Sequence, residues 1–154
     1  MVNGFMVPLD GTDNKILKEL VTDGRLSYRQ VAKRIGVAVG TVQSRMRRME
    51  EEGVIQGYSV LLDYDKLGYA LTVVTEITVS KGKLSETEKA IAELTSSCAV
   101  YDVTGLTDAI VIAKFRNRDE LSNFTKGLLK MQFIERTNTH VVLSIHKEDF
   151  RLPI

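Results

Sequence analysis

The chain has 154 residues, of which 44% are apolar, and its 21 Lys and Arg nearly balance its 20 Asp and Glu. This length allows one domain or two small ones, and the composition excludes a disordered polyelectrolyte. There is no apolar run of roughly 20 residues and residues 1–5 lack a signal pattern, so we expect a cytoplasmic protein without membrane association. One cysteine excludes an internal disulfide, and with only two histidines we expect neither a metal site nor a cofactor.

Basic residues gather in one stretch of this nearly neutral chain. The segment from Gly24 to Met49 contains no acidic residue and seven cations, namely Arg25, Arg29, Lys33, Arg34, Arg45, Arg47 and Arg48. Such a patch is typical of a region that meets a polyanion, although a solvated helix face would carry the same charge. The pattern of apolar residues has to decide between the two interpretations.

The first part of the chain shows the spacing of three short helices. Asp10 or Thr12 can cap the first helix, and Gly24 stands where a left-handed C-cap would end it. Residues 27–30 read as a capping box that opens the second helix, which Gly36 ends. Both helices carry apolar residues at the three- and four-residue spacing of one buried face.

The third helix is expected to present a polar face opposite an apolar stripe. At about 100° per residue, one stripe gathers Val39, Val42, Met46 and Met49. The opposite side carries small polar residues and arginines, with Gln43 and Arg45 at its flanks. Its members are Gly40, Thr41, Ser44, Arg47 and Arg48.

Two short helices joined by a tight turn, the second with such a face, are the parts of a helix-turn-helix. Small residues let a helix enter the major groove, where Gln43, Ser44 and Arg47 can bond base edges while other cations hold phosphates. The alternative is an ordinary helical hairpin with a solvated face. We predict a surface for double-stranded DNA that consists of Arg29, Gly40, Thr41, Gln43, Ser44, Arg45, Arg47 and Arg48.

After Gly57 the apolar period changes to two, which indicates strands. In chain order we predict a short strand at 58–63, a strand at 69–80, a helix opened by a capping box at 85–88, strands at 98–104 and 109–115, a helix over 121–128 and a strand at about 136–146. The order β-α-β-β-α-β after the first short strand is that of a ferredoxin-like sandwich. The predicted fold class is thus α+β, a winged-type helix-turn-helix followed by this sandwich.

Two helices can cover only one face of a four-stranded sheet. The other face of the strand at 69–80 mixes small, hydroxyl and apolar side chains, Val74 among them. Such a face suits packing against the sheet of a second copy. We therefore predict a homo-oligomer.

The order of landmarks resembles the Lrp/AsnC family of regulators from about Leu9 to Lys147. The matching segments are Leu9-Asp10, Lys15-Ile16-Leu17, Gly36-Val37, Thr41-Val42, Arg45-Met46, Arg48-Met49-Glu50, Gly53-Val54-Ile55, Gly57-Tyr58, Leu67-Gly68 and Val103-Thr104-Gly105 with Asp108. The resemblance implies a homodimer joined through its sheets, larger assemblies, and an amino-acid effector bound between dimers. It also implies an effector site formed by Gly105, Leu106, Thr107, Asp108, Thr137 and Thr139.

The resemblance divides the chain into a DNA-binding domain at 1–56, a linker strand at 57–68 and an oligomerisation and effector domain at 69–154. The sequence does not indicate a role for residues 1–8 or 148–154. Ala38 stands where relatives usually have a Ser cap, which predicts a third helix less stable by about 1 kcal/mol. Residues 105–108 could also be a simple hairpin turn, because Gly and Asp are common turn residues.

Two other functions are consistent with the sequence. An architectural protein would compact DNA with little sequence choice. An enzyme is the third possibility, because sirohaem decarboxylases are similar to this family in both domains; it would use groups such as His140 and His146. A regulator that is not an enzyme remains our prediction.

Overall fold

The computed structural model describes residues 6–80 and 82–154 and divides the chain into two compact units. The first contains the residues up to Leu61 together with Glu148–Ile154, and the second is Leu62–Lys147. The division falls inside the predicted linker, but the last residues group with the first unit. Residues 1–5, where the sequence lacks a signal pattern, lie outside the described residues. No helix in the described part of the chain is long and apolar enough to cross a membrane.

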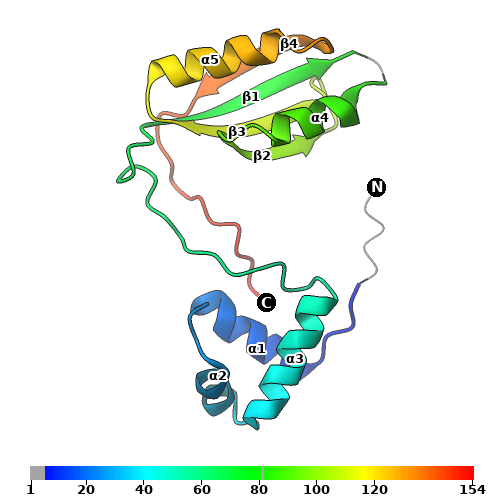
Figure 1. The fold of residues 1–154 in the computed structure, drawn as a ribbon, viewed down its shortest axis with the longest axis vertical. Helices are drawn as coiled ribbons and strands as arrows, with labels where there is room; N and C mark the ends of the chain where they lie inside the picture. The colour runs from blue at the N-terminus through cyan, green and yellow to red at the C-terminus, as the bar shows by residue number, and fades with distance from the viewer. Residues whose placement is uncertain (1–5, 81) are drawn as a thin grey trace. The chain divides into compact units, whose positions relative to one another are not determined.

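Three helices form the first unit, as the sequence predicts (Figure 1). They are α1 (Gly11–Thr22), α2 (Tyr28–Ile35) and α3 (Val39–Glu51). Each of the first two begins with a capping box, because Asp10 and Ser27 accept backbone N–H groups that the first helical turn leaves unpaired. The buried core between the three helices contains Ile16, Leu17, Leu26, Val31, Ala32, Val42, Met46 and Met49.

Two predictions about these helices are wrong. Gly24 is not left-handed, because α1 ends earlier, at an extended C-cap residue Asp23. Val39 is 41% exposed and does not join the buried stripe of α3. It is the first residue of the helix, where the chain has just left the turn and the neighbouring helices do not yet cover it.

A four-stranded antiparallel sheet with two helices forms the second unit, which confirms the predicted order of elements (Figure 1). In chain order the elements are β1 (Leu71–Val79), α4 (Leu84–Ala92), β2 (Ser97–Asp102), β3 (Ala109–Phe115), α5 (Arg118–Leu129) and β4 (Ile134–Val141). The strands lie in the order β2-β3-β1-β4. The two helices pack on one face through Ile91, Phe124 and Leu128, against Val73, Ile77, Val111 and Phe115 of the sheet.

Three boundaries in the second half differ from the prediction. Residues 58–63 form no ladder within the described residues, so the predicted linker strand is not a strand in this single copy. The helix α4 begins at Leu84 with no side-chain cap, so the predicted capping box at 85–88 is wrong. The last strand runs from Ile134 to Val141 and ends before His146, because β1 begins at Leu71 and offers few partners beyond that point.

No helix covers the other face of the sheet in the described residues, and side chains at its centre, such as Val74 and Ile112, are partly exposed. Val74, Ile112 and Ala99 lie side by side across β1, β3 and β2 on this face. The same face carries Asn138 and His140 of β4, next to Glu76 of β1. Toward one end, the Nζ of Lys114 donates to the Thr72 hydroxyl at 3.1 Å. This surface has the mixed character that predicted packing against a second copy.

Candidate nucleic-acid interface

A tight turn sets the start of α3. Gly36 adopts φ 75°, and its N–H and that of Val37 both donate to Ala32 O, at 2.9 and 3.1 Å. A side chain with a Cβ would be strained at this φ, so glycine is the residue that lets α2 end and α3 begin so soon. Ala38 is the N-cap of α3 and makes no side-chain cap hydrogen bond, as the sequence indicates.

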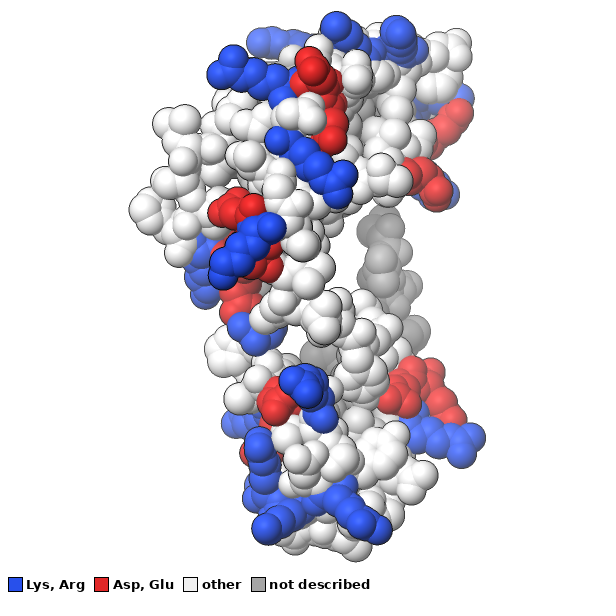
Figure 2. Space-filling model, turned by 60° about the vertical axis from the view of Figure 1, so that its left-hand side comes forward, with Lys and Arg blue, Asp and Glu red and all other residues white. Residues whose placement is uncertain are grey.

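The predicted DNA-facing side of α3 is open to solvent over most of its length. Its exposed members are Gly40, Thr41, Gln43, Ser44 and Arg47. A Cβ built at Gly40 would meet nothing within 4 Å, so this side of the helix could approach another molecule closely. Figure 2 shows Lys and Arg side chains gathered on one end of the first unit.

A buried carboxylate holds α1 against α3. Asp13 is fully buried, and its Oδ2 accepts from the Asp10 N–H at 3.0 Å and from Arg48 Nη2 at 2.6 Å. Arg45 Nη1 lies 3.3 Å from the same oxygen and 2.6 Å from Asp10 Oδ2. The pKa of the Asp10 carboxyl is lowered, first by the Asp13 backbone N–H that it accepts and also by Arg45.

This network gives Arg45 and Arg48 an internal role that the sequence interpretation did not foresee. Both side chains are about two-thirds covered and turn toward α1, away from the exposed face of α3. Arg48 Nε also lies 3.7 Å from Glu52 Oε2. Two guanidinium groups that donate to one buried carboxylate fix the angle at which a helix lies, because their hydrogen bonds are directional.

The other cations of the basic patch fall into two groups. Arg34 pairs with Glu19 at 2.9 Å, and Arg47, 79% exposed, pairs with Glu51 at 2.8 Å one turn along α3. Arg25, Arg29 and Lys33 have no acidic side-chain partner within the described residues. The exposed pairs Arg34–Glu19 and Arg47–Glu51 contribute little to stability, and either arginine can exchange its carboxylate for a phosphate.

Sequence reasoning missed a contact between α3 and the chain that follows it. The Tyr58 hydroxyl donates to Glu50 Oε1 at 2.8 Å. Burial raises the pKa of Tyr58, and the hydrogen bond to the Glu50 carboxylate raises it further. A Tyr and a Glu separated by eight residues across a helix end carry no spacing signal, so this contact could not be predicted from the sequence.

The predicted effector loop connects β2 to β3. Gly105 has φ 135°, a conformation that favours glycine, and the Leu106 side chain is fully exposed. The Thr107 hydroxyl donates to Ala109 O at 3.0 Å. Asp108 Oδ2 accepts the Val79 N–H at 2.8 Å, and Asp108 N donates to Ile77 O, so this residue ties the loop to the end of β1.

The two threonines predicted for the same site lie on β4. Thr137 is opposite Ile77 in the register of β1 and β4, at the sheet end where Asp108 is attached. Thr139 is one pair further along, and its hydroxyl lies 3.1 Å from that of the buried Thr75. Both threonines face the side of the sheet that α5 covers. The structure therefore brings Thr137 and Asp108 to one end of the sheet and leaves Thr139 in a hydrogen-bonded pair.

The two histidines considered for an enzyme do not share an element. His140 is on the open face of β4, with Nε2 3.0 Å from Asn138 Nδ2 and 3.6 Å from Glu76 Oε1. His146 follows the end of β4 and contacts Ser144 at 3.5 Å. The predicted strand at about 136–146 would have carried both histidines, but the ladder ends at Val141 and leaves His146 outside it.

Comparison with protein families matches both units. Residues 9–56 match the winged helix-turn-helix DNA-binding family, and residues 72–152 match the Lrp/AsnC ligand-binding domain. An uncharacterized HTH-type transcriptional regulator of Pyrococcus furiosus is 51% identical over 144 residues, which cover 94% of this chain and 97% of the relative. The HTH-type transcriptional regulator FL11 of Pyrococcus horikoshii is 36% identical, with 96% and 98% of the two chains covered.

Solved structures show the same fold over nearly the whole chain. A transcriptional regulator of Neisseria meningitidis in complex with L-Met has a TM-score of 0.86 at 25% identity, covering 95% of this chain and 97% of that one. AsnC of E. coli has a TM-score of 0.85 at 23% identity, with 93% and 97% covered. This chain belongs to the Lrp/AsnC family of transcriptional regulators, with an N-terminal DNA-binding domain and a C-terminal ligand-binding domain.

Proposed function

We propose that this regulator reads specific DNA sequences as a homodimer or larger assembly, acting in the cytoplasm on promoter DNA. The observation that carries the proposal is the exposed, small and polar side of α3, on which Gln43, Ser44 and Arg47 are accessible. A dimer would place two such helices in successive major grooves, about 34–36 Å apart.

The predicted contact residues receive different roles in this proposal. Gln43, Ser44 and Arg47 read base edges, and Gly40 and Thr41 allow close approach. Arg29 binds phosphate. Arg45 and Arg48 hold α3 in place through Asp13 and do not read bases.

Replacing Arg47 tests the groove assignment. Arg47→Ala removes a side chain that is exposed and held only by the weak pair with Glu51, so folding should be unaffected. We expect binding to the operator to weaken by about tenfold or more, with relaxed base preference at one position per half-site, in a competition assay at fixed salt.

Lys18→Ala on α1 is the matched control, since Lys18 is exposed on the same unit but lies off α3. Unchanged discrimination between operator and scrambled DNA in the Arg47 variant would contradict the groove assignment. Equal binding of both DNAs by the parent protein, with a steep loss at high salt, would favour the architectural alternative.

The ligand that controls the regulator is an amino acid bound at the end of the sheet formed by residues 105–108 and Thr137, between dimers. The similar Neisseria meningitidis regulator, solved in complex with L-Met, supports this class of ligand. Gly105 leaves the backbone open to close approach, and Asp108 has a second carboxylate oxygen, Oδ1, to receive an ammonium group. The ligand controls DNA binding by favouring one assembly over another.

Asp108→Asn separates the two roles of this residue. The amide oxygen of asparagine can still accept the Val79 N–H, so we expect stability to change by no more than about 1 kcal/mol. The charge that would bind the ammonium is lost. Thermal shift against the twenty amino acids, read with light scattering, should show a responding amino acid for the parent protein and none for the variant. A parent protein that responds to none of them would contradict the effector proposal.

A further inference from the structure

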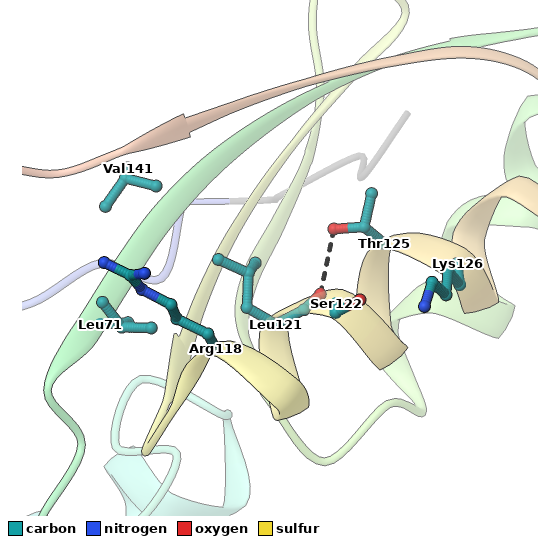
Figure 3. Close-up of a pocket in the computed structure, with 7 residues that line it drawn as sticks. All are labelled: Leu71, Arg118, Leu121, Ser122, Thr125, Lys126 and Val141. Atoms are coloured by element: carbon teal, nitrogen blue, oxygen red, sulfur yellow. Dashed lines mark hydrogen bonds between the residues drawn. The ribbon is translucent and has the colours of Figure 1, made fainter.

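Between α5 and the ends of β1 and β4 lies a hollow of about 560 Å³, within the size range of small-molecule sites (Figure 3). It lies entirely within the second unit. Its lining consists of Leu71, Arg118, Leu121, Ser122, Thr125, Lys126 and Val141. None of these residues belongs to the predicted effector site.

Aliphatic side chains form one wall of this hollow. Leu71 and Val141 lie at the same end of the sheet on neighbouring strands, and Leu121 comes from the first turns of α5. Val141 remains 49% exposed. An aliphatic ligand that covered these three side chains would remove apolar surface from water, which is the general driving force for binding in such a hollow.

The charges around the hollow are all of one sign. Arg118 and Lys126 line it, and no acidic residue does. Neither cation has an ion-pair partner within the described residues, whereas Arg45, Arg47 and Arg48 of the first unit all do. Figure 3 shows the Arg118 guanidinium extending toward the side on which Leu71 and Val141 lie. Two unpaired cations in a partly apolar hollow attract an anion and repel a cation.

The hydroxyl groups of Ser122 and Thr125 lie beside the apolar wall. The Thr125 hydroxyl donates to Leu121 O at 3.0 Å, the dashed line in Figure 3, and so belongs to the helix. Ser122 lines the hollow between Arg118 and Lys126 in the sequence of α5. It can donate to an oxygen of a ligand.

We propose that this hollow binds a short aliphatic monocarboxylate that has no ammonium group. The Arg118 guanidinium would bind the carboxylate, and the aliphatic chain would cover Leu71, Leu121 and Val141. An α-amino acid fits poorly because its ammonium would meet two cations and no carboxylate. The site is separate from the amino-acid site, since Ile77, next to Asp108, is about 20 Å along β1 from Leu71.

Three probes with one carbon skeleton test the assignment on the full chain by isothermal titration calorimetry. They are 4-methylpentanoate, leucine, which adds an ammonium, and 4-methylpentan-1-ol, which lacks the carboxylate. We expect 4-methylpentanoate to bind about tenfold more tightly than either of the others. Equal affinity of the alcohol, or leucine binding as tight as that of 4-methylpentanoate and weakened by Arg118→Gln, would overturn the proposal. Leucine binding that Arg118→Gln leaves unchanged belongs to the separate amino-acid site.

Arg118→Gln should weaken 4-methylpentanoate binding by about tenfold, because the charge-assisted hydrogen bonds are lost. Lys130→Gln is the matched control, since Lys130 follows the end of α5 and does not line the hollow. Operator binding without ligand should be the same for both variants and the parent, so failure here leaves the DNA-binding proposal untouched. If 4-methylpentanoate gives no heat and Arg118→Gln changes the mass of the assembly by light scattering, the hollow is a contact between copies and the proposal is wrong.

Discussion

Replacing Asp13 with alanine is expected to destabilise the three-helix unit by about 3 kcal/mol and to abolish DNA binding. The carboxylate is fully buried and accepts hydrogen bonds from Arg45, Arg48 and the Asp10 backbone. Its removal takes this acceptor from both guanidinium groups and from the Asp10 N–H, and leaves Arg45 with only the exposed Asp10 carboxylate. The cost stays below that of a fully buried pair because both arginines remain about one-third exposed.

Hydrogen exchange read on peptides from α1, α2 and α3 would measure this loss separately from the second unit. Glu19→Gln is the matched control, since Glu19 also joins a helix to a neighbour, but through the half-exposed Arg34. That variant should lose no more than about 1 kcal/mol. If Asp13→Ala and Glu19→Gln lost equal stability, Asp13 would not be the residue that holds α3 in position.

Ile112→Asp should convert the proposed assembly into monomers and lower operator affinity by about a hundredfold or more. Ile112 lies at the middle of the open sheet face, between Val74 and Ala99 on the neighbouring strands. In a dimer formed through this face, each copy would bury a carboxylate in an apolar contact, which is strongly unfavourable. A monomer would also lose the gain in affinity that comes from joining two recognition helices.

Light scattering gives the mass of the assembly, and circular dichroism shows whether the monomer keeps its fold. Leu129→Asp is the control, because Leu129 is 57% exposed at the end of α5, on the helix side of the sheet. It introduces the same charge without touching the open face. A variant at Ile112 that keeps the parent mass would show that the copies associate elsewhere.

The limits of the sequence are clearest at α3. Its existence, its uncapped start at Ala38 and the polar side with Gln43 and Ser44 follow from local spacing, because helix periodicity and caps are properties of neighbouring residues. The roles of Arg45 and Arg48 depend instead on Asp13, more than 30 residues away. A pattern of alternating charge and apolar residues cannot show which of several arginines turns inward.

The strands show a similar limit. Alternation in β1 predicts its buried face correctly, with Val73, Ile77 and Val79 inward. The same alternation continues past Val141 and through 58–63, where the described chain forms no ladder. Alternation of apolar residues indicates an extended chain. A segment becomes part of a sheet only when a partner strand pairs with it, and the residues of the segment do not specify that partner.

The internal pairing of the arginines has a consequence for how tightly one copy can hold DNA. Arg34, Arg45, Arg47 and Arg48 already pair with acidic side chains, so Arg25, Arg29 and Lys33 are the described cations of the patch that can displace condensed counterions without first breaking an ion pair. Three displaced ions correspond to a slope of about −3 when the logarithm of affinity is plotted against the logarithm of salt concentration. Each copy is thus expected to be a weak polyelectrolyte ligand, and the proposed binding as an assembly would supply durable occupancy of a promoter through several copies engaged at once.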